Sequence, residues 1–275
     1  KAGGTTLRLP PAFYYLEYLS ALLFGGSPAG IATLNMLLSV ATIFVFYLFI
    51  KRYFSEFLAL GLTLAFAVSE FFVMYGRFAW NPNLIPFFLL LGLYALLRSA
   101  DDEDAHRDRY FLLAAASLAL AMQFHFLAFV SIPIIVGLFL LLRRPVYAWK
   151  TWLGSIGVAL LLFVPMFLNE TQTGFANSKA FLQAVTEKSS KKDYSLLEKG
   201  IKEFSEYALN GMVVTTGFEG GTFPKIVIGT EEGEVVGWAC DARCDRGKWY
   251  GVSAVIVFGL SLIVLCWFVV RQGAR

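Results

Sequence analysis

A short polar segment, Arg77 to Asn83, lies between two long apolar runs and carries one cation, one indole and two amides. The runs before and after it cover residues 57–75 and 84–97, and both have the composition of membrane spans. Polar groups at the edge of the hydrocarbon are costly unless they are paired or hydrated, so a cluster there indicates a binding site. The alternative is an interfacial anchor, because Trp, Tyr and Arg also form belts at membrane surfaces.

Other residues that could bind an anion or a sugar hydroxyl flank the remaining apolar runs. Two tyrosines follow Arg8 before the first run, Gln123 and His125 interrupt a long apolar stretch, and Glu170 follows a later run. On the topology argued below, all of these positions fall at one membrane face, so we expect the side chains to converge. The candidate substrate-binding residues are Arg8, Tyr14, Tyr15, Arg77, Asn81, Asn83, Gln123, His125 and Glu170.

Each of these residues also has a purely structural explanation. Asn81 and Pro82 suit the first turn of a helix, and a lone interfacial histidine is more often structural than catalytic. Glu70 lies two helical turns before Arg77, so a contact between them would neutralise a carboxylate at membrane depth. The sequence leaves both kinds of explanation open.

The composition excludes an ordinary soluble domain. Hydrophobic residues make up 57% of the 275 residues, and only 16% are charged, against about 25% in a typical soluble protein. The apolar residues gather in blocks of roughly the length that a bilayer demands. We therefore predict an all-α polytopic membrane protein. The net charge of +3 does not indicate a nucleic-acid partner, and no segment has the pattern of a signal peptide.

Seven membrane spans are predicted, at about residues 31–50, 56–75, 84–98, 110–125, 127–142, 151–168 and 251–270. The stretch 110–142 is divided at Phe124-His125-Phe126, because one helix of that length would exceed the roughly 30 Å of hydrocarbon. Two further helices are predicted, one after Pro10-Pro11 that lies in the interface and one near residues 195–209. Strands are predicted around Val213-Val214, residues 225–228 and residues 234–236.

The orientation follows from the Lys and Arg residues of the short loops. They concentrate in residues 51–55, 99–109 and 143–150, which places these loops in the cytoplasm and the candidate site on the extracytoplasmic face of the cell membrane. The predicted organisation is an extracytoplasmic interfacial segment (1–30), a transmembrane bundle with the site (31–168), a mixed extracytoplasmic segment (169–250), and a last span with a cytoplasmic tail (251–275).

The cysteines predict a disulfide and no metal site. Cys240 and Cys244 lie in the predicted extracytoplasmic segment, where the surroundings are oxidising, so a bond between them is expected. No second Cys or His pair accompanies them, so a zinc site is not predicted. The sequence predicts no cofactor and gives no support for a divalent metal.

Several segments within residues 7–180 resemble motifs of the GT-C glycosyltransferases, in particular the protein O-mannosyltransferase-like branch that includes the aminoarabinose transferases. Arg77 to Asn83 resembles the branch's SR-x-x-WNPN segment, and Gln123-Phe124-His125 resembles its Q-x-H turn. The other matching segments are 9–15, 23–25 with Asn35, 164–170 and 174–177.

The resemblance implies a GT-C-like bundle that transfers a hexosyl or pentosyl group, with inversion, from a polyprenyl-phosphate donor to an acceptor at the outer face. It implies that the catalytic residue is an acid of the first outer loop, upstream of Lys1, so we expect a fragment and assign no catalytic residue. The expected partners are the lipid-linked donor and membrane lipid. Leu9 stands where relatives carry a phosphate-binding Lys or His, and Arg8 is one residue away.

Three functions are compatible with these features. The first is a membrane glycosyltransferase whose acceptor is a lipid, a glycan or a protein. The alternatives are a carrier or transporter of lipid-linked glycans and a non-catalytic membrane protein. A transporter more often places charges near the middle of its spans or breaks its helices there. Here the polar residues gather at one interface, which favours the enzyme.

Overall fold

The structure is a computed structural model that describes residues 8–101, 103–186, 196–216, 225–227, 237–239 and 242–273. The chain divides into two compact units, residues 1–67 with 73–189 and residues 68–72 with 190–275. Each unit is described by itself below.

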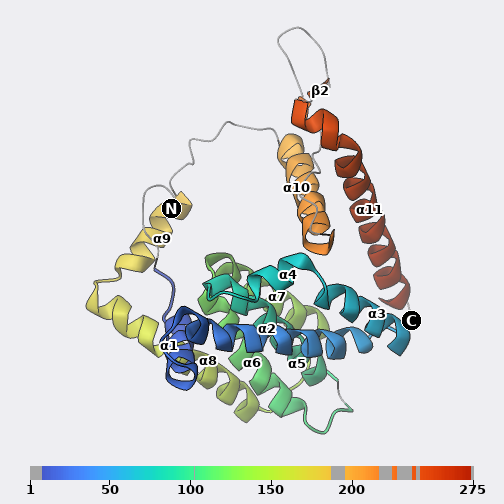
Figure 1. Cartoon of the computed structure of the whole chain (residues 1–275). Coiled ribbons are helices and arrows are strands. Elements are labelled where there is room, and N and C mark those ends of the chain that lie inside the picture. The colour runs from blue at the N-terminus through green and yellow to red at the C-terminus, as the bar shows by residue number, and fades with distance from the viewer. Residues whose placement is uncertain are drawn as a thin grey trace. The chain divides into compact units, whose positions relative to one another are not determined.

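The first unit is a helical bundle (Figure 1). Its elements are α1 (Ala12–Phe24), α2 (Pro28–Lys51), α3 (Glu56–Ala67), the 3₁₀ turn η1 (Asn81–Leu84), α5 (Ile85–Ser99), α6 (Arg107–Phe124), α7 (Phe126–Arg143), α8 (Trp149–Gln172) and α9 (Ala176–Thr186). The short helix α4 (Glu70–Tyr75) begins in the second unit and ends in the first.

The predicted all-α polytopic class is confirmed. Seven spans were predicted, and five helical segments of the described chain are long and apolar enough to cross a membrane. They are α2, η1 with α5, α7, α8 and residues Gly247–Val264 of α11. The helices within residues 56–75 and 110–125 are not among them.

Helix α6 forms the centre of the bundle and packs against α1, α5, α7 and α8. Small residues make this possible, since Ala114 and Ala121 are almost completely buried and let neighbouring helices approach closely. An aromatic contact joins the same helices, with the ring centroids of Phe88 in α5 and Phe124 in α6 lying 5.4 Å apart. This packing holds the carboxyl end of α6, where Gln123 and His125 lie.

The predicted division of residues 110–142 is confirmed. Helix α6 ends at Phe124, His125 has an extended backbone (φ −155°, ψ 142°), and α7 begins at Phe126. The His125 imidazole caps α7, because its Nδ1 accepts a hydrogen bond from the backbone N–H of Leu127 at 3.2 Å. The break is therefore a capped helix start.

The prediction of one continuous span over residues 56–75 was wrong. The segment forms α3, which ends at Ala67, and the six-residue α4, which begins at Glu70. No Gly or Pro marks this break. The buried hydroxyl of Ser69 donates a hydrogen bond to the Val214 carbonyl, so a contact distant in sequence accompanies the interruption.

Ionic and aromatic contacts join the helix ends that carry most of the short-loop basic residues. The Arg52 guanidinium lies 3.1 Å from Asp101, and Arg98 lies 2.5 Å from Asp104. The backbone N–H of His106 and the Arg98 guanidinium hold the pKa of Asp104 below its usual value.

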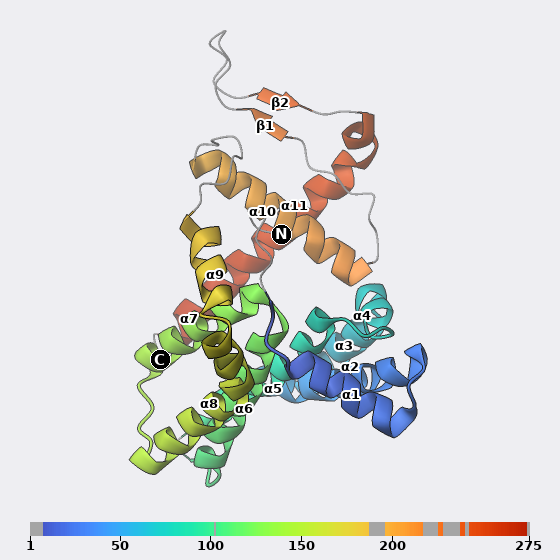
Figure 2. The ribbon, with the colours of Figure 1, turned by 90° about the vertical axis from the view of Figure 1, so that its left-hand side faces the viewer.

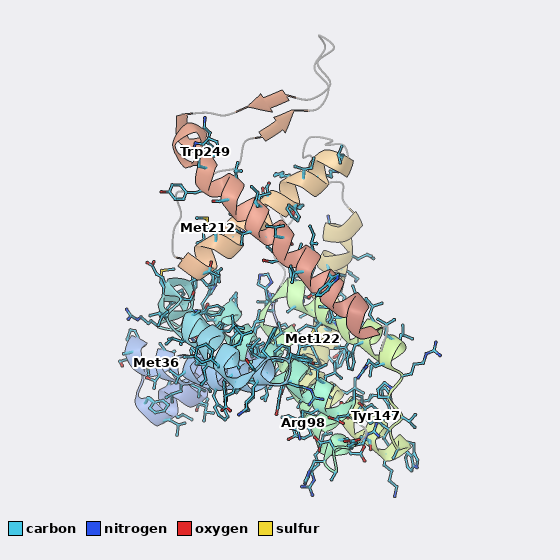
Figure 3. The ribbon with its side chains drawn as sticks, turned by 90° about the vertical axis from the view of Figure 1, so that its right-hand side faces the viewer. Met36, Arg98, Met122, Tyr147, Met212 and Trp249 are labelled. Carbon is cyan, nitrogen blue, oxygen red and sulfur yellow. The ribbon has the colours of Figure 1, made fainter. Side chains whose placement is uncertain are left out.

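A buried hydrogen bond strengthens the same end of the bundle. The Tyr147 hydroxyl and the Ser99 hydroxyl lie 2.8 Å apart, and the Tyr147 ring stacks on Phe111 with centroids 4.2 Å apart. Figure 3 shows Arg98 and Tyr147 at this end and Met122 further along the bundle. These contacts join the end of α5 to the start of α6 and to the residues just before α8.

The second unit contains α10 (Leu196–Thr216), β1 (Lys225–Val227), β2 (Gly237–Ala239) and α11 (Ala242–Gly273). Phe204 of α10 and Phe258 of α11 meet edge to face at 5.3 Å, and the two strands pair antiparallel (Figure 2).

The second unit tests three of the predictions. The helix near residues 195–209 is confirmed and extends to Thr216, so the predicted strand at Val213-Val214 was wrong. The strand predicted at residues 225–228 is present over Lys225–Val227. Residues 234–236, Cys240 and the side chain of Cys244 lie outside the described residues, so the disulfide stays a prediction.

Candidate functional site

A pocket of about 290 Å³ lies where the segment before α1 meets the end of α8 and the start of α9. Three of the predicted site residues line it: Arg8, Tyr15 and Glu170. The remaining lining residues are Leu9, Pro10, Pro11, Pro165, Met166, Asn169 and Asn177. This polar pocket therefore contains a guanidinium, a phenol, a carboxylate and two amides.

A second pocket, of about 140 Å³, shares part of this wall. Residues 8–10, Met166 and Asn177 line both pockets. The other lining residues of the second pocket are almost all apolar: Met122, Phe126, Phe129, Phe181 and, as the polar member, Ser178. We call it the apolar pocket.

Aromatic packing builds the apolar pocket from three helices. Phe126 of α7 and Phe181 of α9 have ring centroids 5.0 Å apart. Phe129 meets Phe163 of α8 edge to face at 6.1 Å. The capped start of α7 at His125 therefore positions an aromatic wall.

Arg8 is held by its backbone. Its N–H donates to Asn177 Oδ1 at 2.7 Å, and the Asn177 amide donates back to the Arg8 carbonyl at 2.8 Å. The Arg8 residue as a whole is exposed, so its cation is accessible from the pocket side. A guanidinium of this kind can bind a phosphate through two parallel hydrogen bonds.

Glu170 is buried, with only 4% of its surface exposed. Its Oε2 accepts hydrogen bonds from the backbone N–H and the hydroxyl of Ser178, at 3.0 and 2.6 Å. Ser178 belongs to the first turn of α9, where free N–H groups attract a carboxylate. Glu170 therefore fixes the start of α9 as well as lining the polar pocket.

Three other predicted residues make structural hydrogen bonds to backbone carbonyls or amides. Asn83 donates to the carbonyls of Tyr75 and Phe78, at 2.6 and 3.0 Å. Gln123 is only 1% exposed and donates to the Leu162 carbonyl at 3.1 Å, near the point where Pro165 removes a donor from α8. The cap that His125 makes is the third case.

Arg77, Asn81 and Tyr14 are placed outside both pockets. Within the described residues, the side chains of Arg77 and Asn81 make no hydrogen bond or ion pair, and Arg77 is exposed. The same holds for the exposed Glu70, so no ion pair neutralises that carboxylate in the described chain. Tyr14 is 59% exposed.

An aromatic group accompanies Arg77. The ring of Tyr75 stacks on that of Trp80 at 5.8 Å, and Phe78 lies 5.6 Å from Tyr75. Asn35 of α2 supports this loop by donating to the Phe78 carbonyl at 2.9 Å. The segment from Arg77 to Asn83 is thus an aromatic loop held by hydrogen bonds. This arrangement agrees both with a binding site and with an interfacial anchor.

The candidate set drawn from the sequence omitted Asn177 and Asn169, both of which line the polar pocket. Asn177 was visible only as the last residue of the segment 174–177 that resembles a family motif. Its partner is the peptide group of Arg8, so no local pattern of side chains could reveal the contact.

The bundle of apolar helices defines a multi-pass membrane protein with a polar pocket beside an apolar one. The sequence model of the dolichyl-phosphate-mannose-protein mannosyltransferase family matches residues 8–168, more than half of the chain, and the chain belongs to that family. It is a membrane glycosyltransferase of the GT-C type. Comparisons with curated proteins and with solved structures gave no match.

Proposed function

We propose that the protein transfers a hexosyl or pentosyl group from a polyprenyl-phosphate donor to an acceptor at the extracytoplasmic face of the cell membrane. One observation carries the proposal: a polar pocket with an arginine shares a wall with an apolar pocket. A prenyl-phosphate sugar is amphiphilic in the same way, with an anionic head beside a hydrocarbon chain.

The chemistry assigns roles to the residues of the polar pocket. The acceptor oxygen forms a new bond to the anomeric carbon of the sugar and gives its proton to a general base. The bond between the sugar and the phosphate breaks at the same time, and the prenyl phosphate leaves with the electron pair and two negative charges. Arg8 would stabilise that charge through hydrogen bonds from its guanidinium to the departing phosphate. Tyr15 and Asn169 would contact sugar hydroxyls, since a phenol and an amide can both donate and accept. Prenyl units would lie against Phe126 and Phe129.

We infer structural roles for Glu170 and Gln123, since their side chains already hold α9 and α8. His125 has its Nδ1 occupied by the helix cap, and its Nε2 remains a candidate donor to a sugar hydroxyl or to phosphate. Asn83 braces the loop that carries Arg77 and lines neither pocket, so the proposal gives it a structural role.

Binding to the purified protein in detergent tests the function. We expect a short polyprenyl monophosphate to bind saturably and to be displaced by polyprenyl-phosphate mannose. The matching prenyl alcohol should bind much more weakly, because it lacks the charge that Arg8 recognises. Equal affinity for the alcohol and the phosphate would contradict the proposal and leave a general lipid site.

The proposed orientation is tested by labelling single cysteines in a variant without Cys240, Cys244 and Cys266. Ala105 and Ala148 are exposed and lie in the basic loops, so cysteines there should react with an impermeant reagent only after permeabilisation. A cysteine at the exposed Gln172, near the polar pocket, should react in intact cells. Labelling of position 148 in intact cells would place the pocket in the cytoplasm.

A further inference from the structure

The extended segment before α1 forms the partition between the two pockets. Arg8, Leu9 and Pro10 line both of them. Figure 2 shows the segment in dark blue, leading from the region of α9 to α1. Its position therefore decides the shape of both pockets.

Asn177 holds this partition. The two hydrogen bonds between the Asn177 amide and the Arg8 peptide join residues 169 positions apart in the sequence. The amide mimics a paired strand, because it accepts from the N–H and donates to the carbonyl of one residue. Within residues 8–10 the structure gives no other hydrogen bond to the rest of the described chain.

Asn177 is itself fixed by the corner between α8 and α9. The carboxylate of Glu170 holds Ser178, and the Glu170 carbonyl accepts from the Phe175 N–H at 2.7 Å. Gly174 and Phe175 have positive φ values of 63° and 61°, so the chain reverses sharply here. For Phe175 this conformation is unfavourable, and it persists because its surroundings hold it.

We propose that Asn177 is a positioning residue for the donor site, acting through the peptide of Arg8. Its amide fixes residues 8–10 so that a prenyl phosphate places its phosphate beside Arg8 on one side of the partition and its chain among the aromatic residues on the other. The inference rests on the proposed function, and it assigns to the α8–α9 corner the task of keeping the two pockets separate.

A series of variants in the purified protein tests this role. Asn177→Leu removes both hydrogen bonds, and we expect it to weaken binding of a short polyprenyl monophosphate roughly tenfold. Asn177→Asp keeps an acceptor for the Arg8 N–H and should give an intermediate affinity. The control Gln172→Leu removes an exposed amide at the end of α8 and should bind as the unchanged protein does. The melting temperature is measured for every variant.

A double-mutant cycle separates positioning from simple stabilisation. If Asn177 acts through Arg8, Arg8→Gln should weaken binding much less in the Asn177→Leu background than in the unchanged protein. If the effects of the two substitutions on binding are additive, Asn177 does not act through Arg8. The same holds if Asn177→Leu keeps its affinity and only lowers the melting temperature, and Asn177 would then have a structural role alone. Failure of the unchanged protein to bind the phosphate would instead overturn the proposed function, and the positioning role with it.

Discussion

Replacing Arg8 with glutamine should lower the rate of sugar transfer by roughly 100-fold, since removing one preorganised donor to a developing oxyanion typically has an effect of this size. Arg8 lines both pockets, and its peptide is held by Asn177, so the cation starts from a fixed point. The rate of Arg8→Lys should lie between the rates of Arg8→Gln and the unchanged protein, because lysine keeps the charge and loses the planar pair of donors. Transfer is measured from labelled polyprenyl-phosphate mannose in membranes of cells that express the protein together with the upstream acidic residue that the family resemblance implies.

Arg77 supplies the matched control for this experiment. It is exposed, lines neither pocket, and has no ion-pair partner among the described residues. Arg77→Lys should therefore keep the rate within about twofold, the range of a typical surface substitution. A large loss at Arg77 with little change at Arg8, at equal protein abundance, would move the phosphate site to the loop of residues 77–83.

The helical framework was predictable because its signals are local. Apolar runs longer than about 15 residues specify helices, and the excess length of 110–142 required a break near His125. Pro10-Pro11 marked the start of α1, which begins at Ala12. Each of these depends on composition or spacing within one segment, and the structure agrees with them.

The interruption between α3 and α4 shows what local signals miss. Residues 56–75 contain no proline, and their one glycine, Gly61, lies well inside α3. The helix ends where Ser69 bonds to the carbonyl of Val214, a partner 145 residues away. A serine in a helical sequence is compatible with either state, and residues 56–75 carry no local signal of this distant partner.

The candidate site was predicted only in part, because tertiary contacts also decide which polar side chains line a pocket. Residue type identifies which side chains can bind a phosphate or a sugar, and it selected Arg8, Tyr15 and Glu170, which share one pocket. Residue type does not reveal whether a side-chain amide is already hydrogen-bonded within the protein. Gln123 and Asn83 carry the same groups as Asn169, yet they are engaged with backbone carbonyls.

The junction between α1 and α2 should be as sensitive to substitution as the site itself. We expect Gly30→Ala to destabilise the protein by about 3 kcal/mol or more, since a rigid clash in a packed core costs at least the upper end of the usual range. A methyl group on Gly30 would overlap the Gly25 carbonyl oxygen and approach that of Phe24 to 2.6 Å. Both atoms belong to the backbone and cannot rotate away.

The same junction is held by Ser20, whose fully buried hydroxyl donates to the Gly30 carbonyl at 2.7 Å and accepts from the Leu34 N–H at 3.0 Å. Helix α1 carries Tyr15 and follows directly from the partition at residues 8–10. Displacing α1 should therefore weaken binding of polyprenyl monophosphate together with stability, even though Gly30 lines neither pocket.

Gly26→Ala is the control, because a methyl group there would meet nothing within 4 Å and the backbone does not have the positive φ that favours glycine. Thermal unfolding in detergent should show a markedly lower melting temperature for Gly30→Ala and almost none of that change for Gly26→Ala. Equal melting temperatures for the two variants would mean that α1 is not held against α2 at Gly30. The position of α1 beside the polar pocket would then depend on its packing against α6 and on the Asn177 contact to Arg8.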